Sequence, residues 1–460
     1  MKLQAAATCA LLTLTAVALA PELRACHVAA KLHFEKTPAE QREARARELG
    51  ARWMKINAEM DMQPIAYRLR GTQECQGGMA DIFPCRSVDL LAHLPLSAIG
   101  GGAGNDIWGW TDAGSGREFA LVGRTNGTAF VEISDPENPV FLGNLPTHTG
   151  ESTWRDIKIY QDHAFIVSDN NPGHGMQVFD LSQLLNVSSP PNTFSNTAHY
   201  DDFSSAHNIV INEDSGFAYA VGGEDCAGGL HMINVQNPTS PVFAGCFQDD
   251  GYTHDAQCVN YKGPDTEHQG QEICFNSNED TLTIVDVTDK LNPVQLSRTG
   301  YSNVGYAHQG WLNAAQTHFY LDDELDERVF GMNTRTLIWD LTDLDAPSVT
   351  VFMSPLPASD HNQYVHDGHL YQANYTAGLR ILRLNPNSTL TEVAFFDTLP
   401  EQDDNRFSGA WSVYPFFASG SVIVSDINRG LFVLRPRLEP PPGLIFRDDF
   451  DSGDLVFWGP

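Results

Sequence analysis

The chain reads as a series of short hydrophobic runs separated by turn residues. Between residues 106 and 146 these runs are "DIWGWTD", "REFALVGRTNG", "TAFVEISDP" and "PVFLGNLP". β-Branched and aromatic residues dominate the runs, and Gly, Asn-Gly and Asp-Pro mark the breaks between them. The pattern predicts four short β-strands in about fifty residues, which is the size of one propeller blade.

Two sequence markers repeat with a common period. The first marker is a polar residue at the start of each copy, with successive differences of 50, 52, 47, 54 and 53: Asp106, Asp156, Asn208, Asp255, Gln309 and Asn362. The second marker is a turn such as "ISDPENP" (133–139) or "WDLTDLDAP" (339–347). A seventh, incomplete copy begins near Trp411 and stops one strand short, at the Pro-rich "RPRLEPPPG".

The missing strand of the seventh copy has a candidate at the other end of the repeats. The stretch "SVDLLAHLPL" (87–96) precedes the first copy and resembles the fourth strand of a complete one. Sheets of this size cannot cover their own faces, so the blades must stack, and closing the ring removes exposed edges. The sequence therefore predicts an all-β, seven-bladed β-propeller over residues 75–436, closed by an N-terminal strand. Six or eight blades are the alternatives.

Three segments lie outside the predicted propeller. Residues 1–25 contain one early Lys and then a short apolar run, which is the pattern of a signal peptide and is too short for a membrane span. Residues 26–74 are expected to form a partly helical leader, with Thr37-Pro38 as a helix start. Residues 437–460 are expected to form a Pro-rich linker and a C-terminal tail. No other stretch is long and apolar enough to cross a bilayer.

The cysteines indicate an oxidising compartment. Apart from Cys9 in the signal segment and Cys26 near its end, six cysteines remain, and they fall into three sequence-close pairs: Cys75–Cys85, Cys226–Cys246 and Cys258–Cys274. The sequence contains no C-x2-C spacing of the kind that would suggest a zinc site. Disulfides are therefore the better interpretation, although six cysteines allow fifteen pairings.

The charge balance narrows the choice of partners. There are 28 Lys and Arg against 58 Asp and Glu, so the net charge is 28 − 58 = −30. A deficit of basic groups this large argues against nucleic acid or an anionic membrane surface as a partner.

A histidine precedes the repeated polar residue in four consecutive copies. Equal register in successive blades means equal height on the wall of the central channel, so these imidazoles should share one channel mouth. Imidazole favours zinc, copper, iron or nickel, and Asp255 is the carboxylate that we expect beside the rings. The sequence thus predicts a divalent metal site, of unknown metal, formed by His207, His254, Asp255, His308 and His361.

The same register has a second interpretation that stays open. Repeat proteins also place polar residues at equivalent positions to form hydrogen bonds between neighbouring blades. An acidic run, "YLDDELDER" (320–328), would add further carboxylates to a metal site, but a solvated loop is the simpler interpretation.

Several longer stretches resemble a known family. "WRDIKIYQDHAFIVSD" (154–169), "HGMQVFDL" (174–181) and "LTIVDVTD" (282–289) are similar to the LVIVD-repeat propeller proteins of bacteria. More narrowly, the chain resembles their exported choice-of-anchor B group, roughly over residues 75–436. The resemblance implies a secreted, periplasmic or cell-surface propeller, and it implies no established reaction.

Catalytic motifs are absent from the sequence: it contains no G-x-S-x-G, no P-loop and no H-E-x-x-H. We therefore expect a binding or scaffold module with protein or glycan partners outside the cytoplasm. The alternative is a metal-dependent hydrolase or lyase with its site at the channel mouth. Solvent access separates the two, because a catalytic ion needs an open coordination position.

Overall fold

The computed structural model describes residues 38–66 and 71–439. The predicted signal peptide and most of the predicted C-terminal tail lie outside the described residues. Contacts divide the chain into two units, Met1–Arg45 and Ala46–Pro460. The described part of the first unit, residues 38–45, is helical. The second unit contains all of the β-strands.

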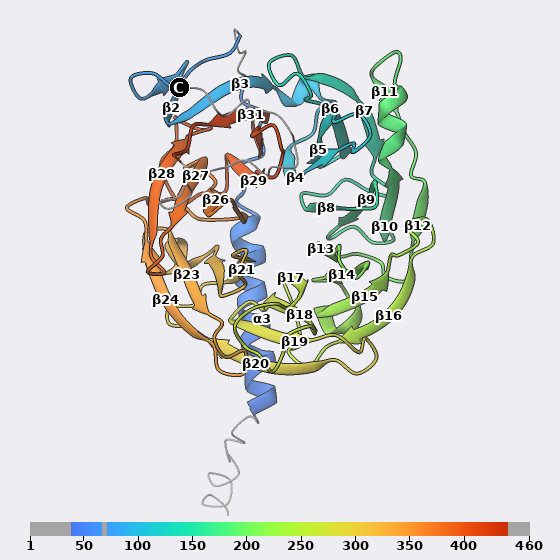
Figure 1. The fold of residues 1–460 in the computed structure, drawn as a ribbon, viewed down its shortest axis with the longest axis vertical. Coiled ribbons are helices and arrows are strands. Elements are labelled where there is room, and N and C mark those ends of the chain that lie inside the picture. Colours follow the sequence, from blue (N-terminus) through green and yellow to red (C-terminus); the bar gives the residue numbers. More distant parts are fainter. Residues whose placement is uncertain (1–37, 67–70, 440–460) are drawn as a thin grey trace, which may run out of the picture. The chain divides into compact units, whose positions relative to one another are not determined.

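Seven antiparallel sheets follow one another around a ring (Figure 1). Blade one consists of β4 (Gly104–Thr111), β5 (Glu118–Arg124), β6 (Gly127–Glu132) and β7 (Val140–Pro146). Blade two consists of β8 (Arg155–Tyr160), β9 (His163–Ser168), β10 (Met176–Asp180) and β12 (Ala198–Tyr200). Blade three consists of β13 (Asn208–Asn212), β14 (Phe217–Val221), β15 (Leu230–Asn234) and β16 (Val242–Phe247). Blades four and five consist of β17 (Asp255–Asn260), β18 (Glu272–Ser277), β19 (Thr281–Asp286) and β20 (Val294–Gly300); and β21 (Ala307–Leu312), β22 (His318–Asp323), β23 (Arg335–Asp340) and β24 (Ser348–Met353).

Blades six and seven complete the ring. Their strands are β25 (Gln363–His366), β26 (His369–Ala373), β27 (Leu379–Leu384) and β28 (Leu390–Phe396); and β29 (Ala410–Tyr414), β30 (Val422–Asp426), β31 (Gly430–Pro436) and β3 (Val88–Leu94). The prediction of seven blades is confirmed. Short helices occur in the connections: η2 (Leu96–Ala98), η3 (Leu181–Asn186), η4 (Asp225–Gly228) and α4 (Asp326–Phe330).

The N-terminal strand closes the ring as the sequence predicts. β3 pairs antiparallel with β31, from Val88 opposite Pro436 to Leu94 opposite Leu431. Both faces of β3 are buried. Residues near both ends of the repeat region therefore share the seventh sheet, so this blade forms only when the two ends meet.

Three short strands extend two of the blades at their outer edges. β11 (Asn192–Thr193) runs parallel to β7 in blade one. β2 (Phe83–Arg86) pairs with β28 in blade six, and β1 (Met79–Ala80) pairs with β2. These additions cover the outer edges that the two four-stranded sheets would otherwise expose.

The hydrophobic core lies between blades, because the two middle strands of each sheet are buried on both faces. The rings of Phe130 and Phe179, from blades one and two, stack with centroids 4.6 Å apart. Phe275 and Phe319, from blades four and five, stack with centroids 5.6 Å apart. Burying one such side chain contributes about 1.5–3 kcal/mol, so stacking of blades supplies most of the stability.

All three predicted cysteine pairs form disulfides. Cys258 and Cys274 are direct cross-strand partners in blade four. Cys226–Cys246 joins η4 to β16 in blade three, and Cys75–Cys85 ties the segment before β1 to β2. Disulfides are typical of an oxidising, extracellular environment.

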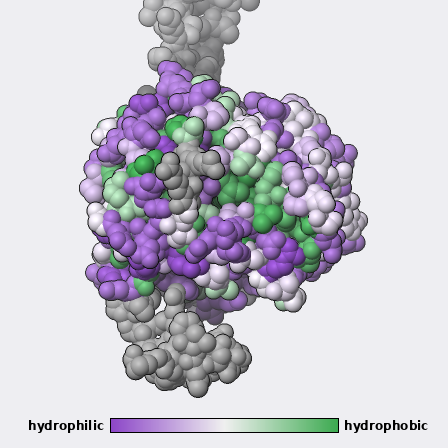
Figure 2. Space-filling model, turned by 90° about the horizontal axis from the view of Figure 1, so that it is seen from above, coloured by the Kyte–Doolittle hydropathy of each residue, from purple (hydrophilic) through white to green (hydrophobic). Residues whose placement is uncertain are grey.

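The leader contains one long helix, α3 (Pro38–Asn57), that packs through its C-terminal part. Leu49, Trp53 and Asn57 recur every four residues, and all three are buried. This spacing puts them on one face of the helix. Within the described residues, no helix has the length and apolar character needed to cross a membrane. The surface seen in Figure 2 is mostly hydrophilic.

Candidate functional site

The four repeated histidines lie side by side around the channel. Ring centroids are 4.4 Å apart for His207 and His254, 4.3 Å for His254 and His308, and 4.4 Å for His308 and His361. Each residue stands at or just before the start of the innermost strand of its blade, and each side chain is buried. The common register of the repeat thus brings four imidazoles together at one channel mouth.

Each of the four rings uses its Nδ1 atom to contact the protein. Two of these hydrogen bonds reach a backbone carbonyl of the following blade, and the other two reach carboxylates. Because Nδ1 is engaged, Nε2 is the atom that remains for a ligand. The partners are Asp169 Oδ2 for His207 (2.9 Å), the His308 carbonyl for His254 (2.9 Å), Asp322 Oδ1 for His308 (3.2 Å) and the Trp411 carbonyl for His361 (2.6 Å).

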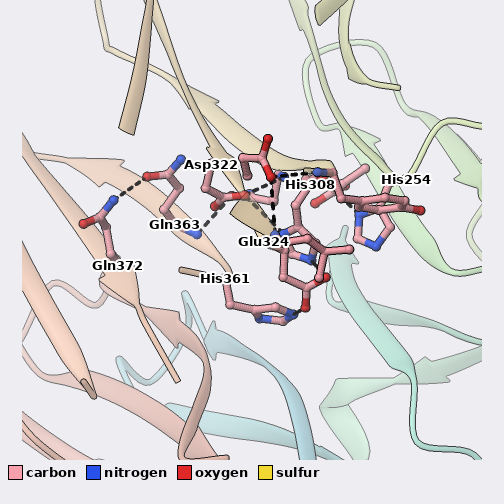
Figure 3. A network of polar contacts seen from close by, with 12 residues as sticks. His254, His308, Asp322, Glu324, His361, Gln363 and Gln372 are labelled. Carbon is pink, nitrogen blue, oxygen red and sulfur yellow. Dashed lines mark hydrogen bonds and ion pairs between the residues drawn. The ribbon is translucent and has the colours of Figure 1, made fainter. Parts of the chain in front are cut away.

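Glu324 supplies a carboxylate among the imidazoles (Figure 3). Its oxygens lie 4.0 Å from Nε2 of His308 and 3.7 Å from Nε2 of His361. One ligand atom from each of these three residues can be chosen so that all lie within 4.8 Å of one another. Glu324 follows β22, the second strand of blade five, and so lies outside the register that carries the histidines.

Burial keeps the imidazoles of His254, His308 and His361 neutral and the Glu324 carboxyl group readily protonated. Loss of water lowers the pKa of His254 and His308 well below the ordinary value, and neighbouring imidazoles lower it further. Burial lowers the pKa of His361 to about 3. Burial also raises the pKa of Glu324 to about 7, although hydrogen bonds to its oxygens oppose that shift. Neutral imidazole is the form that binds metal ions.

Trp53 of α3 covers this mouth of the channel. Its indole Nε1 donates to Glu324 Oε2 at 2.6 Å, and the Tyr375 hydroxyl donates to Oε1 at 2.6 Å. The Trp53 ring also contacts the rings of His207 and His254, with centroids 5.2 and 5.7 Å away.

The cavity between the histidines is small. It has a volume of about 10 Å³ and is lined by all four rings together with Asn208, Asn362 and Trp411, among others. A cavity of this size holds about one water molecule or one ion. Trp53 packs against the rings of His207 and His254, so little space is left around the cluster.

Asp255 lies in a different place from the histidine that precedes it. Successive side chains of a strand point to opposite sides, so His254 and Asp255 cannot both face the histidine cluster. Asp255 lines a larger pocket of about 320 Å³ together with Lys158 and Gln257. Burial, and next the nearby charge of Asp156, raise the pKa of Asp255 to about 7. The structure therefore groups the four histidines with Glu324, and it does not bring Asp255 into that group.

The repeated polar residues connect neighbouring blades. In three of the contacts a side-chain oxygen accepts from a backbone N–H of the next blade, and in the fourth an amide donates to a backbone carbonyl. The register therefore has a structural use alongside any ligand. The contacts are Asp106 with Ile157 N (3.2 Å), Asp156 with Ile209 N (2.7 Å), Gln309 with Gln363 N (2.9 Å) and Asn208 with the His254 carbonyl (2.8 Å).

The acidic run in blade five is buried, so the interpretation as a solvated loop is wrong. Asp322, Asp323, Glu324, Asp326 and Glu327 are each at most 1% exposed. Asp323 accepts from the backbone N–H groups of Gly305 and Tyr306, and both Asp323 and Asp326 pair with Arg335. The run connects β22 to α4 at the covered mouth, and the backbone N–H groups and Arg335 named above are the partners of its buried carboxylates.

Comparisons with known proteins find similar solved structures at low sequence identity. No family model matches the chain, and no curated protein matches it. A solved structure of a Lactobacillus plantarum protein is 12% identical, with a TM-score of 0.47 over 71% of this chain and 91% of that one. The β-propeller domain of Cps50 (Swd1) from Myceliophteria thermophila is 9% identical, with a TM-score of 0.48 over 73% and 98%. Hydrazine synthase from Kuenenia stuttgartiensis is 10% identical, with a TM-score of 0.49 over 70% and 93%.

Proposed function

We propose that this protein is an exported binding or scaffold propeller that carries a divalent metal ion under Trp53. His308, His361 and Glu324 would hold the ion, and His207 and His254 would complete its surroundings. The single observation that supports this assignment is the grouping of one ring nitrogen from each of two imidazoles and one carboxylate oxygen within 4.8 Å of one another. Ligands of this type suit zinc, copper, iron or nickel.

The hydrogen bonds of the rings fit a metal centre. A metal-binding histidine usually donates its other ring N–H to a carboxylate or a carbonyl, which fixes the ring. All four Nδ1 atoms have such a partner. In addition, His254 Nε2 is buried, and no described residue forms a hydrogen bond with it. A bound ion would give this atom a partner.

The closed surroundings favour a structural ion over a catalytic one. A catalytic ion keeps a coordination position open to substrate, whereas a structural ion is enclosed by protein. The cavity between the histidine rings, of about 10 Å³, leaves no room for a substrate beside an ion. We therefore prefer the scaffold function to a metal-dependent hydrolase or lyase.

We further propose that the chain is a member of the LVIVD-repeat propellers of the choice-of-anchor B type. Its protein or glycan partners would lie outside the cytoplasm. The repeat sequences and the apolar N-terminal segment support this assignment, and the three disulfides agree with export.

Elemental analysis tests the metal. Full-length protein recovered from outside the cytoplasm should contain about one transition-metal ion per chain, as expected for a single enclosed site. The His254→Ala and His308→Ala double variant should lose the ion. His163→Ala is the matched control, because His163 lies in the β8–β9 hairpin away from the cluster.

Circular dichroism and thermal melting of the same samples separate a lost ion from a lost fold. A folded double variant without metal supports the proposal. Native protein that contains no metal, and takes up none on dialysis against zinc, would show that the histidines only connect blades.

A further inference from the structure

The mouth of the channel opposite Trp53 opens into a groove. The innermost strands all begin at the covered mouth, so residues later in these strands, such as Gln257 and Trp311, lie toward the other end. They line the pocket of about 320 Å³. A neighbouring pocket of about 700 Å³ shares Gln257, Val259 and Trp311 with it. Both volumes fall in the range typical of ligand sites, and together they form one groove from the channel toward blades five and six.

One wall of the groove is aromatic and held in place by ring contacts. Trp311 lies against Tyr364 with centroids 4.9 Å apart, and Tyr414 lies 5.2 Å from both Trp108 and Phe416. Trp311, Tyr414 and Phe416 are partly exposed. The wall therefore offers preformed apolar ring surface to a ligand.

The facing wall is polar. The Gln257 side-chain oxygen accepts from Leu312 N at 2.7 Å, which fixes the amide and leaves its NH₂ group as a donor of two hydrogen bonds. Lys158 donates to Asp156 at 2.6 Å, and its ammonium lies 4.6 Å from the centre of the Trp108 ring. A cation from solution would find this indole face already occupied.

The charge of the groove excludes anions. The positive charge of Lys158 is balanced by Asp156, whose carboxylate lies 2.6 Å from the ammonium, and the carboxyl group of Asp106 lies 3.9 Å away. Asp255 then adds an acidic group to the lining, and the exposed Glu213 and Asp214 add two more. A phosphate or carboxylate ligand would meet net negative charge here.

We propose that this groove binds a neutral oligosaccharide. A sugar ring has an apolar C–H face that packs on an aromatic side chain, and hydroxyl groups at its edge that bond to carboxylates and amides. Trp311 between the two pockets would carry one ring, while Asp255 and Gln257 would bond to its hydroxyl groups. The assignment rests on the proposed binding function and gives that function a site. It is independent of the metal at the opposite mouth.

Calorimetric titration of the full-length protein with defined tetrasaccharides tests the assignment. The probes are tetrasaccharides of glucose, mannose and N-acetylglucosamine, with a tetrasaccharide of galacturonate as the anionic counterpart. At least one neutral probe should bind, and the anionic one should not. Trp311→Ala should weaken binding about tenfold or more, as expected for loss of a central aromatic contact.

Asp255→Asn provides a second variant, which preserves the shape of the side chain. It should also weaken binding, by the amount that is typical when a hydrogen bond to a charged group is lost. Phe243→Ala is the matched control, because Phe243 is 50% exposed on an outer strand. Its affinity should equal that of the unchanged protein. No binding of any neutral probe, or equal binding in Trp311→Ala and the unchanged protein, overturns the proposal. Metal content measured in the same samples shows whether the metal centre fails separately.

Discussion

The two mouths of the channel use the same innermost strands in opposite ways. Glu324 at the covered mouth and Asp255, which lines the pocket leading to the other mouth, are both acidic groups whose pKa burial raises to about 7. Glu324 is enclosed by Trp53 and Tyr375, and the adjoining cavity has room for one small ion. Asp255 instead faces a pocket of about 320 Å³. Two carboxyl groups with similarly raised pKa values thus lie in different surroundings, one tightly packed and one beside a larger pocket.

This difference separates stability from recognition. At the covered mouth every imidazole has a partner on another part of the chain, and a leader helix packs on top. At the open mouth the aromatic rings contact one another and leave their outer surfaces toward the groove. Changes at the covered mouth should therefore lower the free energy of unfolding, whereas changes at the open mouth should weaken ligand binding.

The largest expected effect comes from opening the ring. Deletion of residues 1–94 removes β3, so blade seven loses its fourth strand and blades one and seven lose their closure. We expect the truncated protein either to lose cooperative unfolding or to aggregate through the bare edge of β31. Either result means that the domain loses its whole free energy of unfolding, on the order of 5–15 kcal/mol. Urea unfolding and size-exclusion chromatography measure it.

Two other deletions serve as controls. Deletion of residues 1–71 removes α3 and uncovers the histidine cluster, but it keeps β3 and should leave the ring closed. Deletion of residues 441–460 removes only chain beyond β31 and should leave folding unchanged. A 1–94 deletion that unfolds like the full chain would mean that β3 does not close the ring.

The same substitution at the two mouths gives the next largest effect. Trp53 is buried and donates to Glu324, so Trp53→Ala should lower the free energy of unfolding by about 3–5 kcal/mol. Trp311 is partly exposed, so Trp311→Ala should cost only about 1 kcal/mol. Urea unfolding of both variants measures the difference. Equal losses would remove the distinction between a sealed mouth and an open one.

The repeat made the fold predictable, because each marker recurs once per blade and equal register means equal height. This is why the ring, the closing strand and the grouping of His207, His254, His308 and His361 follow from the sequence. Glu324 does not follow from it, since it comes from the second strand of one blade. Trp53 lies outside the repeat altogether. Asp255 illustrates a further limit: adjacent residues in a strand point to opposite sides, so proximity in sequence to His254 does not mean proximity in the site.

The two disulfides of blades three and four also fall on the two sides. Cys226 follows β14, whose end pairs with the start of β13 at the covered mouth, whereas Cys258 lines the open pocket. Replacing either pair by serine should lower the free energy of unfolding by about 2–4 kcal/mol, because the loops of 20 and 16 residues are similar in length. Only loss of Cys258–Cys274 should also weaken oligosaccharide binding. Weakened binding in both variants would show that the mouths are coupled.

The last expected effect is a pH dependence of stability on the covered side. His93 of β3 is buried, its Nε2 contacts the Arg429 carbonyl at 2.9 Å, and burial lowers its pKa to about 4. Its unfolded-state pKa is about 6.5, so between these values the unfolded chain binds the proton more readily. Stability is therefore full above pH 6.5 and is lost as the pH falls toward 4, by about 2 kcal/mol at pH 5. His93→Gln can keep the hydrogen bond but cannot titrate. Between pH 7 and pH 5 the free energy of unfolding of this variant should therefore fall by about 2 kcal/mol less than that of the unchanged protein. Urea unfolding at both pH values decides the matter, and parallel pH profiles for the two proteins would mean that acid does not act on ring closure through His93.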